Sequence, residues 1–192
     1  MAQVKHKKKF FDVEIPLINK QTQLQAYSIE ELQDRYIKYD LTRILRGKSI
    51  EMQLKVTVRG GKALAAPRKI TLMPYFLRRM IRKGTNYVED SFSTECKNAQ
   101  IRIKPFLITR RKVSRAVRKA LREKAREESI KYAKTKKVED LFDEIIKNKL
   151  QKILSLKLKK IYPLSLCEIR ILKIEKDLEE KPEKEEEKED KE

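Results

Sequence analysis

An unbroken alternation of apolar and polar residues over Ile50–Arg59 constrains the fold more than any other stretch. The apolar residues at every second position are Ile50, Met52, Leu54, Val56 and Val58. A period of two places them on one face of a β-strand. Gly60 and Gly61 follow and favour a hairpin turn. We therefore expect a return strand over Ala63–Leu72, interrupted around Pro67.

A second strand leads directly into a helix. Residues Gln100–Ile108 alternate in the same way, and Pro105 marks this strand as an edge strand or a bulged one. After Thr109 the pattern becomes helical, with Ser114 as the candidate N-cap and no Gly or Pro before Thr135. The spacing predicts a long helix after the strand.

One side of this predicted helix carries a continuous row of basic side chains. Its members repeat at spacings of three, four and seven, and they are Arg111, Arg115, Arg118, Lys119, Arg122 and Arg126. The side expected to pack on the sheet consists of Ala116, Val117, Ala120 and Leu121. Arginines without carboxylate partners repel one another unless phosphate supplies the countercharge. The row therefore indicates binding to a nucleic-acid backbone.

The remaining segments complete an α+β pattern. Strands are predicted over Phe11–Ile15, Tyr87–Cys96 and Leu164–Ile171, and helices over Pro74–Lys83 and Val138–Leu158. The segment Gln23–Ile29 fits a strand paired with the first one, although Ser28 followed by two glutamates also fits a short helical turn. This order predicts an antiparallel β-barrel of about seven strands with flanking α-helices.

Charge divides the chain into three parts. It holds 48 Lys and Arg against 29 Asp and Glu, a formal net charge of +19. Residues 1–9 form a basic arm, residues 10–174 the folded body, and residues 175–192 a Lys/Glu-rich acidic tail that is predicted to be disordered. A body this basic needs a polyanion as its partner, and RNA or DNA is the best candidate.

No set of residues suited to catalysis or metal binding is apparent. Cys96 and Cys167 each lie in an apolar alternating run and are expected to be small buried hydrophobes in a reducing, cytoplasmic environment. The single His6 lies among lysines, and no glycine-rich phosphate loop is present. Glu89 and Asp90 are neighbours on a predicted strand, so their side chains point to opposite faces. We predict no enzyme activity, no cofactor and no metal.

No apolar run is long enough to span a membrane, so a soluble intracellular protein is expected. The candidate RNA-binding side chains come from the arm, the short helix and the long helix. They are Lys5, Lys7, Lys8, Lys9, Arg78, Arg79, Arg82, Lys83, Arg110, Arg111, Lys112, Arg115, Arg118, Lys119 and Arg122. Phosphate and shape recognition suffices for such a surface.

Three segments resemble the archaeal and eukaryotic small-subunit ribosomal protein family of the S-three-A-e type, in an archaeal-like form. They are RGKSIEMQLKV at Arg46–Val56, the block YFLRRMIRKGTNYVED through IRIKPFLITRRKVSRAVRKAL at Tyr75–Leu121, and IYPLSLCEIRILK at Ile161–Lys173. The resemblance implies a β-barrel with flanking helices on the small-subunit platform beside the messenger exit region. It also implies contacts to ribosomal RNA near its 3′ end and to neighbouring ribosomal proteins, with messenger RNA nearby.

Two other classes of protein remain as alternatives. A dissociable translation factor or messenger-binding regulator would have the same surface chemistry and would differ only in how long it stays on the subunit. A peripheral membrane protein fits poorly, because the apolar side of the long helix is thin and the chain has no Trp.

Overall fold

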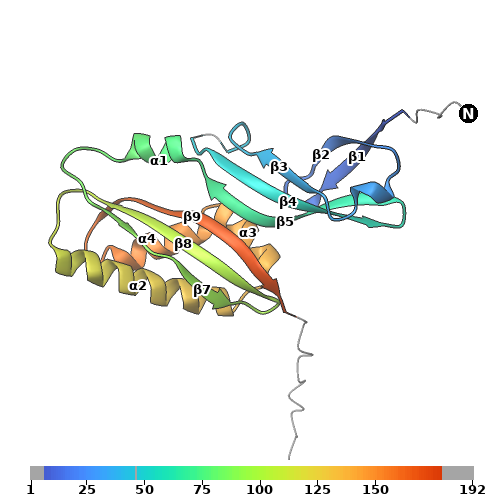
Figure 1. Cartoon of the computed structure of the whole chain (residues 1–192). Helices are drawn as coiled ribbons and strands as arrows, with labels where there is room; N and C mark the ends of the chain where they lie inside the picture. Colours follow the sequence, from blue (N-terminus) through green and yellow to red (C-terminus); the bar gives the residue numbers. More distant parts are fainter. Residues whose placement is uncertain (1–6, 46, 179–192) are drawn as a thin grey trace, which may run out of the picture.

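The computed structural model describes residues 7–45 and 47–178, which form one nine-stranded sheet with helices beside it (Figure 1). The strands are β1 (Lys9–Ile15), β2 (Lys20–Ala26), β3 (Tyr36–Asp40), β4 (Ile50–Arg59), β5 (Lys62–Leu72), β6 (Tyr87–Glu89), β7 (Phe92–Glu95), β8 (Ala99–Thr109) and β9 (Leu164–Asp177). The helices are α1 (Pro74–Met80), α2 (Arg115–Lys134), α3 (Val138–Ile146) and α4 (Lys149–Leu158), with short 3₁₀ turns η1 (Pro16–Ile18) and η2 (Glu30–Leu32).

Strand β5 joins the two halves of the sheet. It pairs with β4 along its whole length, as the hairpin at Gly60 and Gly61 predicts. Near its start, Ala63 pairs in parallel with Val13 of β1, and near its end, Lys69 pairs in antiparallel with Lys173 of β9. The order β2-β1-β5-β9-β8-β6 results, with β4 and β3 branching from β5 and with β7 beside β8.

The sheet does not close on itself. Within the described ranges β2 pairs only with β1, β3 only with β4, and β6 and β7 only with β8. The predicted α+β class is therefore confirmed and the predicted barrel is not. The strand count also exceeds the prediction, because the predicted strand Tyr87–Cys96 divides into β6 and β7 and because β3 was missed. β3 has no fully buried residue, so its alternation is weak.

Strand β8 lies in the middle of its half of the sheet. It pairs with β9 on one side and with β6 and β7 on the other, and the register shifts between Lys104 and Pro105. Pro105 therefore marks a bulge in a central strand, and the edge-strand interpretation is wrong. The break between β6 and β7 lies opposite this bulge.

Helices α2, α3 and α4 pack beside the half of the sheet formed by β7, β8 and β9 (Figure 1). The predicted single helix Val138–Leu158 is wrong, because Asn148 adopts a left-handed conformation with φ of 62° and separates α3 from α4. Asparagine tolerates this conformation better than most residues. Its side-chain oxygen accepts a hydrogen bond from Lys48, which also forms a largely buried ion pair with Glu168 of β9 at 2.6 Å.

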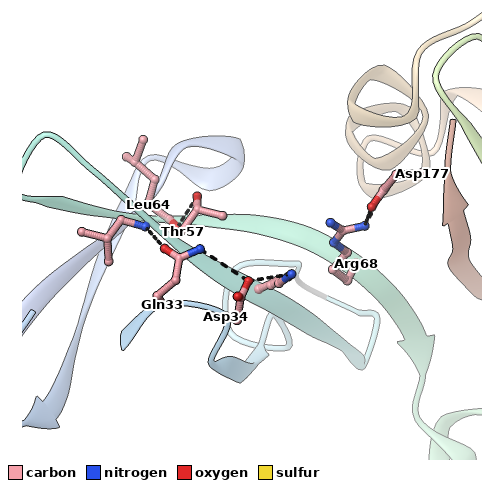
Figure 2. Close-up of polar contacts among 8 residues, drawn as sticks. Gln33, Asp34, Thr57, Leu64, Arg68 and Asp177 are labelled. Atoms are coloured by element: carbon pink, nitrogen blue, oxygen red, sulfur yellow. Dashed lines mark hydrogen bonds and ion pairs between the residues drawn. The ribbon is translucent and has the colours of Figure 1, made fainter. Parts of the chain in front are cut away.

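Strand β9 runs farther than the sequence predicts. It continues to Asp177, so Glu175, Lys176 and Asp177 are strand residues and the predicted start of the tail at Glu175 is wrong. The extension pairs with Ala99 and Gln100 of β8, and it also carries ion pairs, with Arg102 at 2.7 Å from Glu175 and Arg68 at 2.6 Å from Asp177. Figure 2 shows Arg68 reaching across from β5 to Asp177. Residues 179–192, Arg46, Lys5 and His6 lie outside the described residues.

Replacing Leu172 by Ala tests the packing of the core. Leu172 is fully buried on β9, whereas Leu156 on α4 is 69% exposed. We expect Leu172→Ala to lower the free energy of unfolding by about 2–5 kcal/mol, because a buried cavity forms. Leu156→Ala makes the same chemical change on the surface and should cost less than about 0.5 kcal/mol. Urea unfolding followed by circular dichroism measures both, and equal effects would contradict the assignment of β9 to the core.

The two thiols should be unreactive in the folded protein. Cys96 is buried and Cys167 is partly buried. Burial raises the pKa of Cys96, and burial together with the neighbouring Glu168 carboxylate raises the pKa of Cys167 to about 12. Because only the thiolate reacts, we expect Cys167 at pH 8 to react roughly a thousandfold more slowly than a free cysteine. A disulfide reagent applied to the native and urea-unfolded Cys96→Ser variant measures the difference, and similar rates in the two states would refute it.

Candidate nucleic-acid interface

The start of α2 is surrounded by positive charge. Ser114 caps the helix by accepting a hydrogen bond from the Val117 amide at 3.4 Å, as predicted. The first turn contains no acidic residue, although the positive end of the helix dipole favours carboxylates there. Instead Arg115 and Arg118 lie in this turn, and the basic residues 110–112 directly precede it. The combination of helix amides and cations is suited to bind a phosphate.

Asn86 holds the segment before α2 against the segment before β6. Its side-chain oxygen accepts a hydrogen bond from the Val113 amide at 2.8 Å. Its backbone amide donates to the Thr109 hydroxyl oxygen at 3.0 Å, and its carbonyl oxygen accepts from the Thr109 amide at 2.9 Å. The Thr109 hydroxyl oxygen also lies 2.7 Å from the Arg111 carbonyl oxygen. These contacts bring the turn after α1 beside the basic segment 110–112.

The basic residues of the short helix divide between α1 and the turn that follows it. Arg78 and Arg79 lie in the last turn of α1, where cations suit the negative end of the dipole, and Arg79 lies over the Phe76 ring at 5.6 Å. Arg82 and Lys83 lie beyond the helix and are exposed, because α1 ends at Met80 and not near Gly84 as predicted. All four cations therefore lie in the segment that connects β5 to β6.

The predicted basic row on α2 needs two corrections. Arg111 precedes the helix and is not part of the row. Arg126 is already neutralised, because it contacts Asp90 at 2.9 Å and covers the Phe92 ring at 5.5 Å. The predicted packing side also changes: Ala116 is exposed, and the residues of α2 that are buried include Leu121 and Ala125.

The other cations of this region lack carboxylate partners. In residues 7–45 and 47–178, no carboxylate forms an ion pair with Arg110, Arg111, Lys112, Arg115, Arg118 or Arg122. The Nε atom of Arg118 is buried and has no hydrogen-bond acceptor within those ranges. Lys119 has a distant, exposed partner, Glu123 at 3.8 Å. We name the residues 78–83, 110–112, 115, 118, 119 and 122 the basic end.

Glu89 and Asp90 form separate ion pairs, but only Glu89 is a strand residue, because β6 ends there and Asp90 follows it. Glu89 contacts Arg170 at 3.0 Å, and Asp90 contacts Arg126. They line an open hollow of about 430 Å³ together with Lys104, Pro105, Arg122 and others. Of the residues that line this hollow, Arg122 belongs to the basic end. No carboxylate of the described residues forms an ion pair with it.

The described part of the N-terminal arm, residues 7–9, lies away from the basic end. The described chain starts at the opposite end of the molecule from the start of α2 (Figure 1). Lys7 and Lys8 are exposed there, Lys8 lies over the Tyr27 ring at 5.5 Å, and Lys9 is the first residue of β1. Lys5 lies outside the described residues, so the structure gives positions for Lys7, Lys8 and Lys9 of the arm.

Neither a metal centre nor a membrane span is found in the part of the chain that the structure describes. No three His, Cys, Asp or Glu side chains gather there into a cluster able to hold a metal ion. None of its helices is long and apolar enough to cross a bilayer.

A basic α+β domain with cations unpaired in the described residues around a helix start is suited to bind a polyanion, and comparison with known families identifies the kind of protein. The model of the Ribosomal S3Ae family matches residues 3–177. The chain therefore belongs to the Ribosomal S3Ae family. No curated protein matches the chain.

Membership of this family establishes the general role. It is a family of structural ribosomal proteins and not of enzymes, so the chain is a small-subunit ribosomal protein that acts in translation. The family also supports ribosomal RNA and other ribosomal proteins as its partners, and the ribosome as its location. The resemblance and the absence of enzyme activity expected from the sequence are both confirmed.

Replacing Thr109 by Val tests the junction that positions the basic end. The hydroxyl of the fully buried Thr109 contacts both Asn86 and Arg111, so its loss leaves part-buried backbone groups without this partner. We expect Thr109→Val to lower the free energy of unfolding by about 1–3 kcal/mol. The matched control is Thr71→Val, at a half-buried position on β5. Urea unfolding and hydrogen exchange at the Asn86 amide report the effect, and an unchanged exchange rate would show that the junction is held by other contacts.

Proposed function

We propose that the chain is a permanent component of the small-subunit platform beside the messenger exit region, where it binds ribosomal RNA near the 3′ end. The cations that carry this proposal are the unpaired ones around the start of α2, above all Arg110, Arg111, Arg115 and Arg122. These cations are close in sequence and have no carboxylate partner in the described residues, so they repel one another, and RNA phosphates would remove that repulsion. The position on the platform rests on the resemblance of its sequence motifs.

Binding at the basic end would use phosphate and shape and would not require base reading. The cations lie on exposed helix and turn surfaces, and an A-form RNA helix presents its phosphates in a regular array. The lysines of the arm, Lys5, Lys7, Lys8 and Lys9, would contact a separate part of the RNA, since the described arm lies at the far end of the molecule. Messenger RNA would pass near the protein without being its principal ligand.

Sedimentation distinguishes a permanent component from a dissociable factor. Native protein in a lysate is run through a sucrose gradient before and after a high-salt wash of the small subunits. A permanent component stays with the small-subunit peak after the wash. Complete release by moderate salt would instead support the dissociable translation factor or messenger-binding regulator.

Directed cleavage of RNA tests the position on the platform. An iron chelate attached to Lys119→Cys, in a background where Cys96 and Cys167 are Ser, generates hydroxyl radicals beside the basic end. We expect cleavage of small-subunit RNA close to its 3′ end. Cleavage confined to other domains of the RNA would exclude the proposed position.

Neutralising the basic end should weaken the dependence of RNA binding on salt. Replacing Arg115, Arg118 and Arg122 by Gln removes up to three phosphate contacts. Each lost contact lowers the log–log slope of affinity against salt by roughly 0.7–0.9, so a decrease of about 2–3 is expected. Lys149, Lys152 and Lys159 on or beside α4 are exposed, and replacing them by Gln is the matched control. If the two triple variants have equal slopes, the basic end is not the binding surface.

A further inference from the structure

A row of six polar residues, four of them basic, crosses the sheet away from the basic end. Residues directly opposite one another on adjacent strands lie on the same face. The pairing register places one such row across six strands, and its members are Lys38, Gln53, Lys69, Lys173, Arg102 and Ser93. At about 4.8 Å between strands, the part from Lys38 to Arg102 extends roughly 19 Å.

The row lies on the solvent-facing side of the sheet. The fully buried neighbours of the row include Ile70 on β5, Leu172 on β9 and Ile101 on β8, all at 0% exposure. Because successive side chains point to opposite faces, the row points away from the core. In the part of the chain that the structure describes, α2, α3 and α4 contact the sheet, and no helix covers the row. We name this row and its surroundings the open face.

Three cations of the row are direct neighbours. Lys69 lies opposite Lys173, and Lys173 lies opposite Arg102. Like charges in such pairs destabilise a sheet. Arg102 is paired with Glu175, but Lys69 and Lys173 have no carboxylate partner within the described ranges. The open face therefore carries two adjacent unpaired charges that an external anion would stabilise.

A hollow with an aromatic rim lies beside these lysines. Its volume is about 440 Å³, and Tyr36, Lys55, Lys69 and Lys173 are among its lining residues. Tyr36 is 57% exposed, so its ring is accessible to a ligand. Two lining residues of the hollow are held by ion pairs. Asp34 contacts Lys55 at 2.7 Å, and Asp177 contacts Arg68 (Figure 2). Gln33 connects the first pair to β4 by accepting from the Val58 amide at 2.7 Å.

We propose that the open face is a second RNA-binding surface, separate from the basic end, and that it binds a single-stranded segment. Lys69 and Lys173 contact its phosphates, and Tyr36 stacks on a base in the hollow. Exposed aromatic residues on a sheet are a known means of binding unpaired bases, and stacking tolerates any sequence. This inference rests on the proposed function, because it takes RNA as the partner.

The observations favour RNA over an acidic protein segment. An acidic peptide would use the lysines but would gain little from an exposed tyrosine ring beside a hollow of this size. A nucleotide uses both, since it joins a phosphate to an aromatic base. The two partners therefore differ in how much their binding depends on Tyr36.

Fluorescence anisotropy with three labelled probes tests the proposal. The probes are a 12-nucleotide oligouridylate, an RNA hairpin and a 12-residue polyglutamate, each titrated with the full chain. We expect Lys69→Gln combined with Lys173→Gln to lower the salt slope for oligouridylate by about 1.4, from two lost contacts to a single strand. Tyr36→Leu should weaken oligouridylate binding about fivefold or more while leaving that slope unchanged. Hairpin binding through the basic end should be retained in both variants.

Control variants separate this effect from charge and from unfolding. Lys152→Gln with Lys159→Gln makes the same charge change on α4 and at its C-cap, and should leave oligouridylate binding unaltered. The melting temperature of the Lys69→Gln, Lys173→Gln variant should be equal to or higher than that of the wild type, because a repulsive pair is removed.

The outcomes distinguish two failures. If the wild type binds the hairpin but the open-face variants bind oligouridylate as the wild type does, the open face is not an RNA site and the proposed function stands. If neither RNA binds the wild type, both proposals fail. Polyglutamate binding as tight as that of oligouridylate, and insensitive to Tyr36→Leu, would overturn RNA in favour of an acidic protein partner.

Discussion

The shared strand β5 is the constraint on which the rest of the structure depends. It pairs with β1 at its start and with β9 at its end while β4 accompanies it throughout, so the two halves of the sheet form one continuous surface. The pairing of Lys69 with Lys173 marks the place where the second half begins, and the ion pair between Arg68 and Asp177 lies beside it. Because the helices gather beside β7, β8 and β9, one face of the sheet there is packed and the other remains accessible. Both candidate RNA surfaces follow from this arrangement.

The distribution of carboxylates explains why the positive charge of the basic end is not balanced by acidic side chains in the described residues. Several buried or half-buried acids serve the helices: Glu128 of α2 pairs with Lys157 of α4, and Glu144 of α3 contacts Lys136 and Tyr132. The hydrogen bond from Lys157 holds the pKa of Glu128 below its usual range, so this carboxylate stays ionised and paired with Lys157. Within residues 7–45 and 47–178, the basic end has no comparable buried carboxylate partner. Its cations are left for a polyanion, which agrees with a ribosomal protein surrounded by RNA.

Sequence patterns predicted local structure well and spatial relationships poorly. The bounds of β4 agree with the predicted strand, because alternation and the glycine turn are both local signals. The break at Asn148 was missed, since the apolar spacing continues through it. Arg111 was assigned to a helix that begins four residues later. The row containing Lys69, Lys173 and Arg102 could not be found in advance, because it depends on the register of strands that are far apart in the chain.

Arginine footprinting on the ribosome tests most directly the claim that the unpaired cations of the basic end face RNA. A glyoxal reagent is applied to the free protein and to intact small subunits, and modified peptides are quantified by mass spectrometry. We expect Arg110, Arg111, Arg115 and Arg122 to react in the free protein, to be protected in the subunit, and to react again after nuclease digestion. Equal modification in the free protein and the subunit, or protection that survives removal of the RNA, would contradict the claim.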